Sequence, residues 1–253
     1  MNFDDARNKS VNAAGIRLIG TKYVTIRNCI FTGNDNGLFA SGEISDLKVV
    51  DTKFLMNGRN AQSHNVYLSG GTSASFFNCD FIGTIGGQNL KSRVRSLSVL
   101  ACRIEDSKNR ELDLVDGITT DRCEVVISGC KIVKRRSVFQ GGKYIYLVDP
   151  DKWIANQHVI QFGIDSKHEY PVNGTLYLLN NTIVTPYKYP IVTLSSPGAN
   201  LVMVGNTVIR PEGVKGNGTQ QCICVVNAGE LIDRARGWEN TIPDNFIDKD
   251  NYV

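Results

Sequence analysis

Long apolar segments, tryptophan and an excess of charge of either sign are all scarce in this 253-residue sequence. No stretch approaches the ~20 consecutive apolar residues that a membrane-spanning helix requires, so we expect no membrane partner. The 28 Lys and Arg residues almost balance the 25 Asp and Glu residues, and a net charge of +3 does not demand a nucleic-acid partner. The N-terminal MNFDDARNKS has no basic region followed by an apolar core, which predicts that no signal peptide is present.

The seven cysteines include no CxxC pair, which argues against a zinc site or a disulfide framework. Four of them, Cys29, Cys79, Cys102 and Cys130, occupy the same position of an internal repeat. A small apolar side chain that recurs at one repeat position is typical of a packed interior. We therefore expect buried structural cysteines and no cofactor bound to them.

Amphipathic helical patterns of 10–15 residues are also missing, which disfavours a doubly wound α/β fold. Few tight Asn-Gly turns lie where β-hairpins would need them, which disfavours a β-sandwich. The 42% hydrophobic and 21% charged residues exclude a disordered chain. An ordered, strand-rich architecture without hairpins remains.

What the sequence does contain is a repeat with a period near 25 residues. Each copy is an alternating apolar run, a pair of small or polar residues, any residue, and an apolar residue. The copies are VTIRNCIF (24–31), LKVVDTKF (47–54), ASFFNCDF (74–81), LSVLACRI (97–104), VVISGCKI (125–132), LYLLNNTI (176–183) and LVMVGNTV (201–208). The second member of the pair is Cys29, Thr52, Cys79, Cys102, Cys130, Asn181 or Asn206. The long step from Cys130 to Asn181 indicates an insertion near 150–174.

A second short strand follows each copy, at 37–42, 64–70, 88–93, 111–117, 144–149, 189–195 and 222–227, and a matching strand at 15–20 belongs to a preceding coil. Two or three short strands at this period are the signature of a solenoid. We predict an all-β fold, a right-handed parallel β-helix (a single-stranded solenoid) of about 7–8 turns with ~4.8 Å between turns. It should span residues 1–227, and the less regular tail 228–253 should cap its open end.

Stacking of the turns should align equivalent residues into columns inside the coil. The bend pairs should form one column in which Asn side chains hydrogen-bond along the axis. A second, apolar column should consist of Ile30, Phe54, Phe81, Ile104, Ile132, Ile183 and Val208.

Alternation along the second strands predicts a charged and aromatic outer surface. If Leu38, Val66, Leu90, Leu112 and Ile145 point inward, the neighbours that point outward are Phe39, Asn65, Tyr67, Asn89, Lys91, Arg93, Glu111, Asp113, Tyr144 and Tyr146. His64, Arg95 and Asp116 lie at the strand ends. Aromatic faces bind sugar rings, and Lys and Arg bind carboxylate or sulfate groups. The pattern therefore predicts a groove for an acidic polysaccharide.

Two reactions fit this surface. In β-elimination of a uronate, a cation neutralises the carboxylate, a base removes the C5 proton and an acid assists the leaving oxygen. Among the predicted catalytic residues, Arg93 suits neutralisation, Lys91 could be the base, and His64 and Tyr67 are the other acid/base candidates. The predicted substrate contacts are Asn65, Asn89, Arg95, Glu111, Asp113, Tyr144 and Tyr146. In the alternative, a glycoside hydrolase, Glu111 and Asp113 would be the two carboxylates that flank the bond.

Two further interpretations need no catalysis. Lys91 and Arg93 could pair with Glu111 and Asp113 one turn away. Such a surface ion ladder would add little to the stability of the fold. The surface could also belong to a non-catalytic carbohydrate-binding or phage tailspike module. Asp113 and Asp116 are oxygen ligands of the kind that calcium prefers, and the sequence predicts no other metal or cofactor.

Six segments, NAAGIRLIG, DNGLFASG, QSHNVYLSG, GGQNLKSRVR, ELDLVDG and LYLLNNTIV, resemble in order those of a bacterial group of β-helix-repeat proteins within the pectate-lyase-like superfamily. The similarity covers most of residues 12–208. It implies a parallel β-helix and, through similar phage tailspikes, a capsule-degrading function, an extracellular or virion location, and a trimer. The group's G-H-x-x-K-S-R histidine is Gln88 here, and its P-N-G-G is Val115-Asp116-Gly117, so no role is expected for that histidine. The N-T-D, G-H-G and R-I-K motifs of polygalacturonases and the R-x-P-x-x-R stretch of calcium-dependent pectate lyases are missing.

Overall fold

The computed structural model describes residues 1–115, 123–135, 158–164, 173–185, 190–196 and 198–209, and the backbone of the strands at 137–140, 143–146, 223–225 and 246–249. Within these ranges the chain forms strands and turns. They include no helix of the length and apolarity that crossing a membrane would require.

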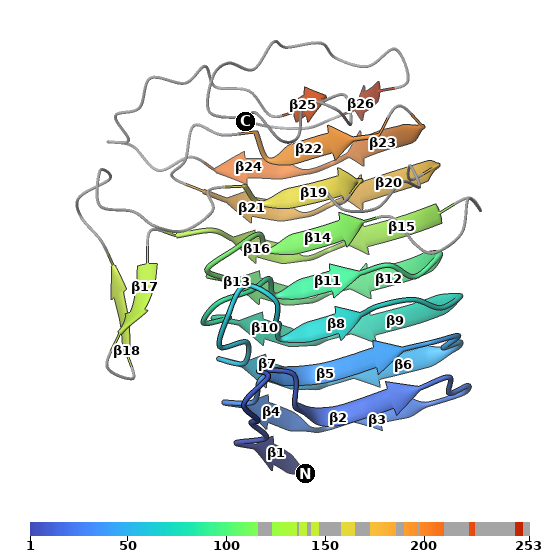
Figure 1. Ribbon diagram of the computed structural model, residues 1–253. Coiled ribbons are helices and arrows are strands. Elements are labelled where there is room, and N and C mark those ends of the chain that lie inside the picture. Colours follow the sequence, from blue (N-terminus) through green and yellow to red (C-terminus); the bar gives the residue numbers. More distant parts are fainter. Residues whose placement is uncertain are drawn as a thin grey trace.

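Three parallel sheets of eight strands each make up the described structure, and every turn of the chain adds one strand to each sheet (Figure 1). Sheet A consists of β1 (Asn2–Asp4), β4 (Ile30–Thr32), β7 (Lys53–Leu55), β10 (Asp80–Ile82), β13 (Arg103–Glu105), β16 (Lys131–Val133), β21 (Thr182–Val184) and β24 (Thr207–Ile209). Sheet B consists of β2 (Ala14–Ile19), β5 (Asn36–Ser41), β8 (Val66–Leu68), β11 (Leu90–Ser92), β14 (Leu112–Val115), β19 (Ile160–Gly163), β22 (Val192–Ser195) and β25 (Ile223–Val225). Sheet C consists of β3 (Thr25–Arg27), β6 (Leu47–Val50), β9 (Ser73–Phe77), β12 (Ser96–Leu100), β15 (Cys123–Ser128), β20 (Gly174–Leu179), β23 (Ala199–Val204) and β26 (Phe246–Lys249).

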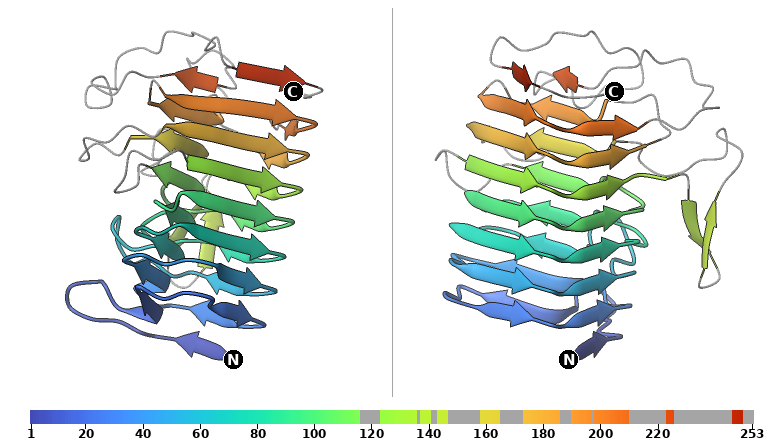
Figure 2. Two further views of the ribbon diagram at one scale, coloured as in Figure 1. Left: turned by 90° about the vertical axis from the view of Figure 1, so that its right-hand side faces the viewer. Right: turned by 180° about the vertical axis from the view of Figure 1, so that it is seen from behind.

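The chain passes through sheets A, B and C in the same order in each turn and coils in a right-handed sense (Figure 1), so the fold is a right-handed parallel β-helix, as predicted. Figure 2 shows the stacked turns from two further sides, with the N-terminal strand at one end of the stack. Each strand of an inner turn hydrogen-bonds to the turns before and after it. Residues about 25 positions apart in the sequence therefore become direct neighbours.

The bend between sheets C and A explains why each copy of the repeat contains a pair of small or polar residues. The first member of the bend pair adopts a left-handed conformation, with φ between 50° and 63°, at Asn28, Asp51, Asn78, Ala101, Gly129, Asn180 and Gly205. Asn and Gly tolerate this conformation best. The chain then turns sharply and directs the second member of the pair into the coil.

The second members stack into the predicted column. The Asn181 amide donates a hydrogen bond to Asn206 Oδ1 at 2.9 Å, and the Cys130 backbone N–H donates to Asn181 Oδ1 at 2.9 Å. Towards the N-terminus the Cys102 and Cys79 backbone N–H groups donate to the sulfur of the next cysteine at 3.4 Å. These three cysteines are buried, as expected, whereas Cys29 in the first copy is only half-buried.

The apolar column of sheet A is also confirmed, with one change. Phe3, Phe31, Phe54 and Phe81 stack with centroid separations of 4.7, 4.9 and 5.3 Å, and the register continues through Ile104, Ile132, Ile183 and Val208. Ile30 pairs instead with Lys53, so Phe31 takes the inward position that was predicted for Ile30.

The sixth turn differs from the prediction. Its sheet B strand is β19, which lies inside the range expected to be an insertion. The predicted strand at 144–149 instead overlaps β18 (Lys143–Tyr146), which pairs antiparallel with β17 (Ser137–Gln140) in a hairpin that projects beside the stack (Figure 1). Alternating apolar residues indicate that a segment forms a strand, but they do not indicate which strand it pairs with. The sequence pattern therefore assigned the strand predicted at 144–149 to the wrong sheet. In the predicted capping tail, β26 adds a strand to sheet C, and the remaining tail residues lie outside the described ranges.

Candidate functional site

Strand register creates a column of side chains on the outer face of sheet B. Its members occupy equivalent positions in successive strands, and we call them the outer column: Arg17, Phe39, Tyr67, Lys91, Asp113, Gln161 and Thr193. Their neighbours along each strand point into the coil. Alternation therefore predicted the positions of Phe39, Tyr67, Lys91 and Asp113 correctly. Arg17 was missed as a site residue, although the matching strand at 15–20 was recognised.

The four predicted catalytic residues come together around Tyr67. The Arg93 Nε–H group donates to the Tyr67 hydroxyl at 3.4 Å. The His64 ring meets the Tyr67 ring edge-on, with centroids 5.2 Å apart. Lys91 occupies the equivalent position on the adjacent strand. The phenol oxygen thus accepts from a guanidinium, the imidazole packs against the phenol ring, and the ammonium group belongs to the residue paired with Tyr67 on the next strand.

His64 is held in one tautomer by its surroundings. His64 is 2% exposed, and its Nδ1 accepts a hydrogen bond from the Gln88 backbone N–H at 3.1 Å. A backbone N–H can only donate, so Nδ1 carries no proton and the neutral ring is protonated at Nε2. Gly87 makes this approach sterically feasible, because a Cβ there would lie 2.4 Å from Nδ1.

Asp113 organises the charged side chains beside Tyr67. Its side chain is 2% exposed and accepts from Lys91 Nζ at 3.1 Å, Gln88 Nε2 at 3.2 Å and Arg110 Nη1 at 3.2 Å. A neighbouring carboxylate favours the protonated form of an amine, and a protonated amine cannot remove a proton. The ion pair with Asp113 thus argues against Lys91 as the proton-removing base.

Both Asp113 oxygens already accept from protein donors, and Asp116, the second predicted calcium ligand, lies outside the described residues. Among the residues that are described, no group of three or more His, Cys, Asp or Glu side chains could hold a metal ion.

Three predicted substrate contacts point into the coil instead of outward. The Asn57 amide donates to Asn65 Oδ1 at 2.8 Å, the Asn65 amide to Asn89 Oδ1 at 2.6 Å, and the Asn89 amide to Glu111 Oε2 at 2.6 Å. All of these residues are fully buried. The prediction that Asn65, Asn89 and Glu111 face solvent is therefore wrong. Each lies in the turn just before its sheet B strand, where the bend reverses the alternation that holds within the strand.

Glu111 ends this chain of amides in a buried ion pair. Lys134 Nζ lies 3.3 Å from Glu111 Oε1 and also donates to the carbonyls of Ser107 and Asn109. Burial raises the pKa of Glu111 and lowers the pKa of Lys134. Because Glu111 is inside the coil and Asp113 is on its outer face, the two cannot flank one glycosidic bond. The structure gives no support to a hydrolase built on this pair.

The aromatic residues also differ from expectation. Tyr144 and Tyr146 belong to the β17–β18 hairpin and are not in register with the outer column, so the prediction that they flank it is wrong. The Phe39 and Tyr67 rings stack on each other, with centroids 5.2 Å apart and an angle of 18° between planes. Their faces are thus not turned outward to sugar rings. Arg95 is half-buried in the turn between β11 and β12.

Comparison of the chain with protein-family models, with curated proteins and with solved structures found no match. The geometry of the outer column is therefore the basis for assigning a function.

Proposed function

We propose that the chain binds an acidic polysaccharide along the outer column of sheet B and cleaves it by β-elimination. The observation that carries the proposal is the contact between the Tyr67 hydroxyl and Arg93 Nε, with Lys91 on the adjacent strand. This arrangement combines groups that neutralise a carboxylate with a group that can transfer a proton. Both are needed at the same sugar unit in this reaction.

In the proposed reaction, Arg93 and Lys91 neutralise the carboxylate of a uronate unit and make its C5 proton more acidic. In its phenolate form, the Tyr67 oxygen, with the Arg93 guanidinium beside it, takes that proton. The bond between C4 and the glycosidic oxygen breaks as the C4–C5 double bond forms. Tyr67 then gives the proton to the leaving oxygen, so atoms balance without water. The His64 ring packs against the Tyr67 ring in a T-shaped arrangement and orients the phenol.

The fold is consistent with this function but does not specify it, because one fold hosts many activities. A parallel β-helix whose segments resemble those of the pectate-lyase-like superfamily would act on polymers outside the cell. Kinship with phage tailspikes would add a virion location, a capsular substrate and a trimer to the proposal. Each of these rests on resemblance, whereas the reaction rests on Tyr67 and its neighbours.

The test is a product assay over a panel of uronate polymers and bacterial capsules. A lyase releases unsaturated products that absorb ultraviolet light, a hydrolase releases only new reducing ends, and a binding module releases neither. We expect unsaturated products from the wild-type chain and a loss of at least ~100-fold in rate for Tyr67→Phe, the usual scale for an acid–base group.

Tyr177→Phe is the matched control. Tyr177 is a half-buried tyrosine on the outer face of sheet C, away from the outer column, and it should leave the rate unchanged. A wild-type chain that binds a polymer tightly and releases no product would identify a binding module instead. A Tyr67→Phe variant with full activity would exclude the mechanism.

A further inference from the structure

The outer face of sheet C lacks the charged side chains that the other two faces of the coil carry. Sheet A has ion pairs between outward side chains, such as Lys53 with Asp80. Sheet B has the pair of Lys91 with Asp113. On sheet C the outward side chains form two columns, and from β9 to β23, where the structure describes every residue of these strands, neither column holds a charged side chain. The first column is Ser75, Ser98, Val126, Tyr177 and Val202, and the second is Phe77, Leu100, Ser128, Leu179 and Val204.

These two columns expose apolar surface to solvent. Phe77 is 51% exposed, and the other apolar members are half-buried. Val50, also half-buried, extends the second column by one strand towards the N-terminus. A continuous apolar surface of this length on a soluble protein marks a site of interaction.

The borders of this face are polar. Outward side chains of Ser96, Glu124 and Asn200 flank the first column, and the bend that follows the second column exposes Asn78 and Asn180. An apolar centre with a polar rim is the composition of a specific protein–protein interface.

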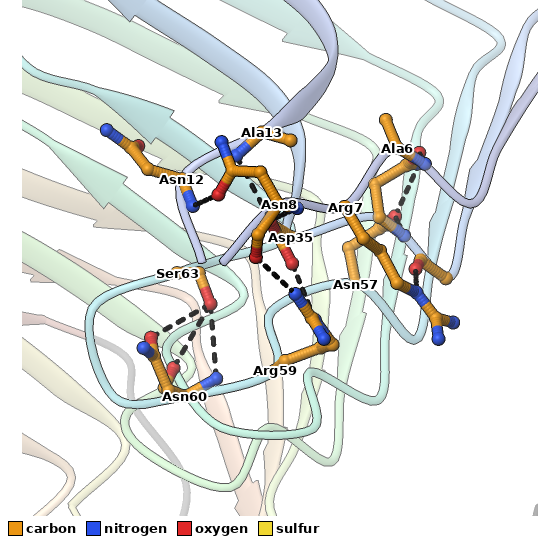
Figure 3. A network of polar contacts seen from close by, with 12 residues as sticks. Ala6, Arg7, Asn8, Asn12, Ala13, Asp35, Asn57, Arg59, Asn60 and Ser63 are labelled. Carbon is orange, nitrogen blue, oxygen red and sulfur yellow. Dashed lines mark hydrogen bonds and ion pairs between the residues drawn. The ribbon is translucent and has the colours of Figure 1, made fainter. Parts of the chain in front are cut away.

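The N-terminal loop of the chain lies elsewhere. Between β1 and β2 it packs on the bend that joins sheets A and B, where Asp35 accepts from the backbone N–H groups of Asn8 at 2.9 Å and Ala13 at 3.1 Å (Figure 3). Arg59 adds hydrogen bonds to Asp35 and to the Asn8 carbonyl. The loop is therefore held at another corner of the coil, which leaves Phe77 open to a second molecule.

Side-chain sizes match if this face packs on a second copy of itself. In β9, β12 and β15 one outward residue is large and apolar and the other is serine: Phe77 with Ser75, Leu100 with Ser98, and Val126 with Ser128. A two-fold axis that runs along the coil, between the two columns, places each large residue over the serine of the same strand in the second copy. Large side chains then fill the hollows above small ones, as in close-packed protein interiors.

The area of the face is also sufficient for a dimer. At ~4.8 Å between strands and ~3.3 Å per residue, the eight strands of sheet C form a face of about 38 by 17 Å. Two copies would together bury on the order of 1,300 Å², within the range of ~1,200–2,000 Å² found for specific interfaces. A two-fold contact uses the same face twice, whereas a threefold ring needs two different faces that fit each other, and sheets A and B offer charged ones.

We infer that the outer face of sheet C is the contact surface of a two-fold dimer, in which two copies of the chain lie side by side with their coil axes parallel. Phe77 is the main anchor, because it is the most exposed apolar residue of the two columns. The residues of the proposed reaction lie on sheet B, so dimer formation and turnover can be measured independently.

Sedimentation equilibrium of the full chain tests the inference. We expect a species of twice the chain mass of 27.9 kDa. Phe77→Glu should raise the Kd of the dimer by at least ~30-fold, the scale of losing an aromatic anchor. Ile209→Glu is the matched control, because Ile209 is 45% exposed but lies on sheet A, and this variant should sediment as wild type. A wild-type chain that is monomeric at every concentration or trimeric, or equal weakening by both variants, would refute the dimer.

Compensating charges test the direction of the two axes. In the parallel arrangement residue 77 lies over residue 75 of the second copy, so Ser75→Lys/Phe77→Glu should recover part of the dimer that Phe77→Glu loses. With antiparallel axes centred on β12, residue 77 would lie over residue 128, and Ser128→Lys/Phe77→Glu would recover it instead. Recovery by the first double variant supports the inference, and recovery by the second alone, or by neither, refutes it.

Two further measurements complete the test. Circular dichroism should show the wild-type strand content in every variant, since the substituted side chains point outward. Unsaturated products from a monomeric wild-type chain would refute the dimer and support β-elimination, whereas a Phe77-dependent dimer that releases no products would do the reverse.

Discussion

Lys134 and Glu111 form an ion pair in the interior of the β-helix, with Nζ 3.3 Å from Oε1 and neither side chain exposed to solvent. The pair ends a line of buried amides that runs from Asn34 through Asn57, Asn65 and Asn89. Through the carbonyls of Ser107 and Asn109 it also fixes the turn that leads to Asp113 on the outer face. The buried Lys134–Glu111 pair therefore links the packing of the interior to the position of Asp113 on the outer face.

Replacing Lys134 with Met should lower the free energy of unfolding by ~3–5 kcal/mol, because Glu111 would remain buried without its partner. Urea denaturation measures this change. The double variant Glu111→Gln/Lys134→Met should recover part of the loss, since it removes the uncompensated charge. Lys131→Met is the control: its amine is exposed and lies 3.9 Å from Glu105, so it should cost less than ~1 kcal/mol. Equal losses in Lys134→Met and the control would contradict this account.

Asp35 should make stability depend on pH. Burial would raise the pKa of this carboxyl, but hydrogen bonds from Arg59, Asn8 and Ala13 outweigh burial and hold the pKa below its ordinary value. A carboxyl with a lowered folded-state pKa stabilises the fold above its unfolded pKa of ~3.9 and loses that contribution as the pH falls through the folded value.

The corresponding variant is Asp35→Asn. It should be less stable than wild type at about pH 7, and the difference should shrink as the pH falls below ~4. Urea titrations at a series of pH values measure both quantities. Asp80→Asn, which removes one partner of a more exposed ion pair with Lys53, should cost less than ~1 kcal/mol at neutral pH. A constant difference between Asp35→Asn and wild type across the pH series would refute the assignment.

Gly87→Ala tests how His64 is positioned. A Cβ at residue 87 would lie 2.1 Å from the Ser63 carbonyl oxygen and 2.4 Å from His64 Nδ1, so the ring and the neighbouring backbone must move. We expect a loss of ~1–3 kcal/mol in stability, the usual cost of overpacking, and a changed NMR signal for the His64 ring.

Gly129→Ala separates crowding from backbone strain. Gly129 has open space around its Cβ position but a φ of +62°, so only the ~1–2 kcal/mol cost of the left-handed conformation should appear. Its His64 signal should match wild type. An unchanged His64 signal in Gly87→Ala would show that Gly87 does not set the ring position.

Lys91→Ala and Arg93→Ala should each reduce turnover by at least ~100-fold if both neutralise the substrate carboxylate. Lys53→Ala is the matched control, because Lys53 also pairs with an aspartate of the adjacent strand but lies on sheet A. If the Lys91–Asp113 pair is only an ion ladder, turnover will stay at the wild-type level, and Lys91→Ala and Asp113→Ala will share a loss of stability. Measuring turnover and unfolding on the same variants separates the two outcomes.

The repeat was sufficient to predict the fold because every turn of a solenoid places equivalent residues in equivalent surroundings. The bend pair illustrates this. Asn181 and Asn206 are 25 positions apart in the chain and directly hydrogen-bonded in the structure. The same reasoning predicted the outward positions of Tyr67, Lys91 and Asp113, because they lie within strands where side chains alternate.

The sequence by itself therefore determined the stacked architecture, the interior columns and the part of the outer column that lies within regular strands. Only the tertiary structure decided which way Asn65, Asn89 and Glu111 point, because turns do not preserve the two-residue period of a strand. It also decided that Tyr144 belongs to a hairpin, since hydrogen-bonding partners and not apolar pattern define a sheet. Contacts between turns, such as those of Arg93 with Tyr67 and of Arg17 with Phe39, depend on the distance between side-chain atoms, which residue spacing alone does not specify.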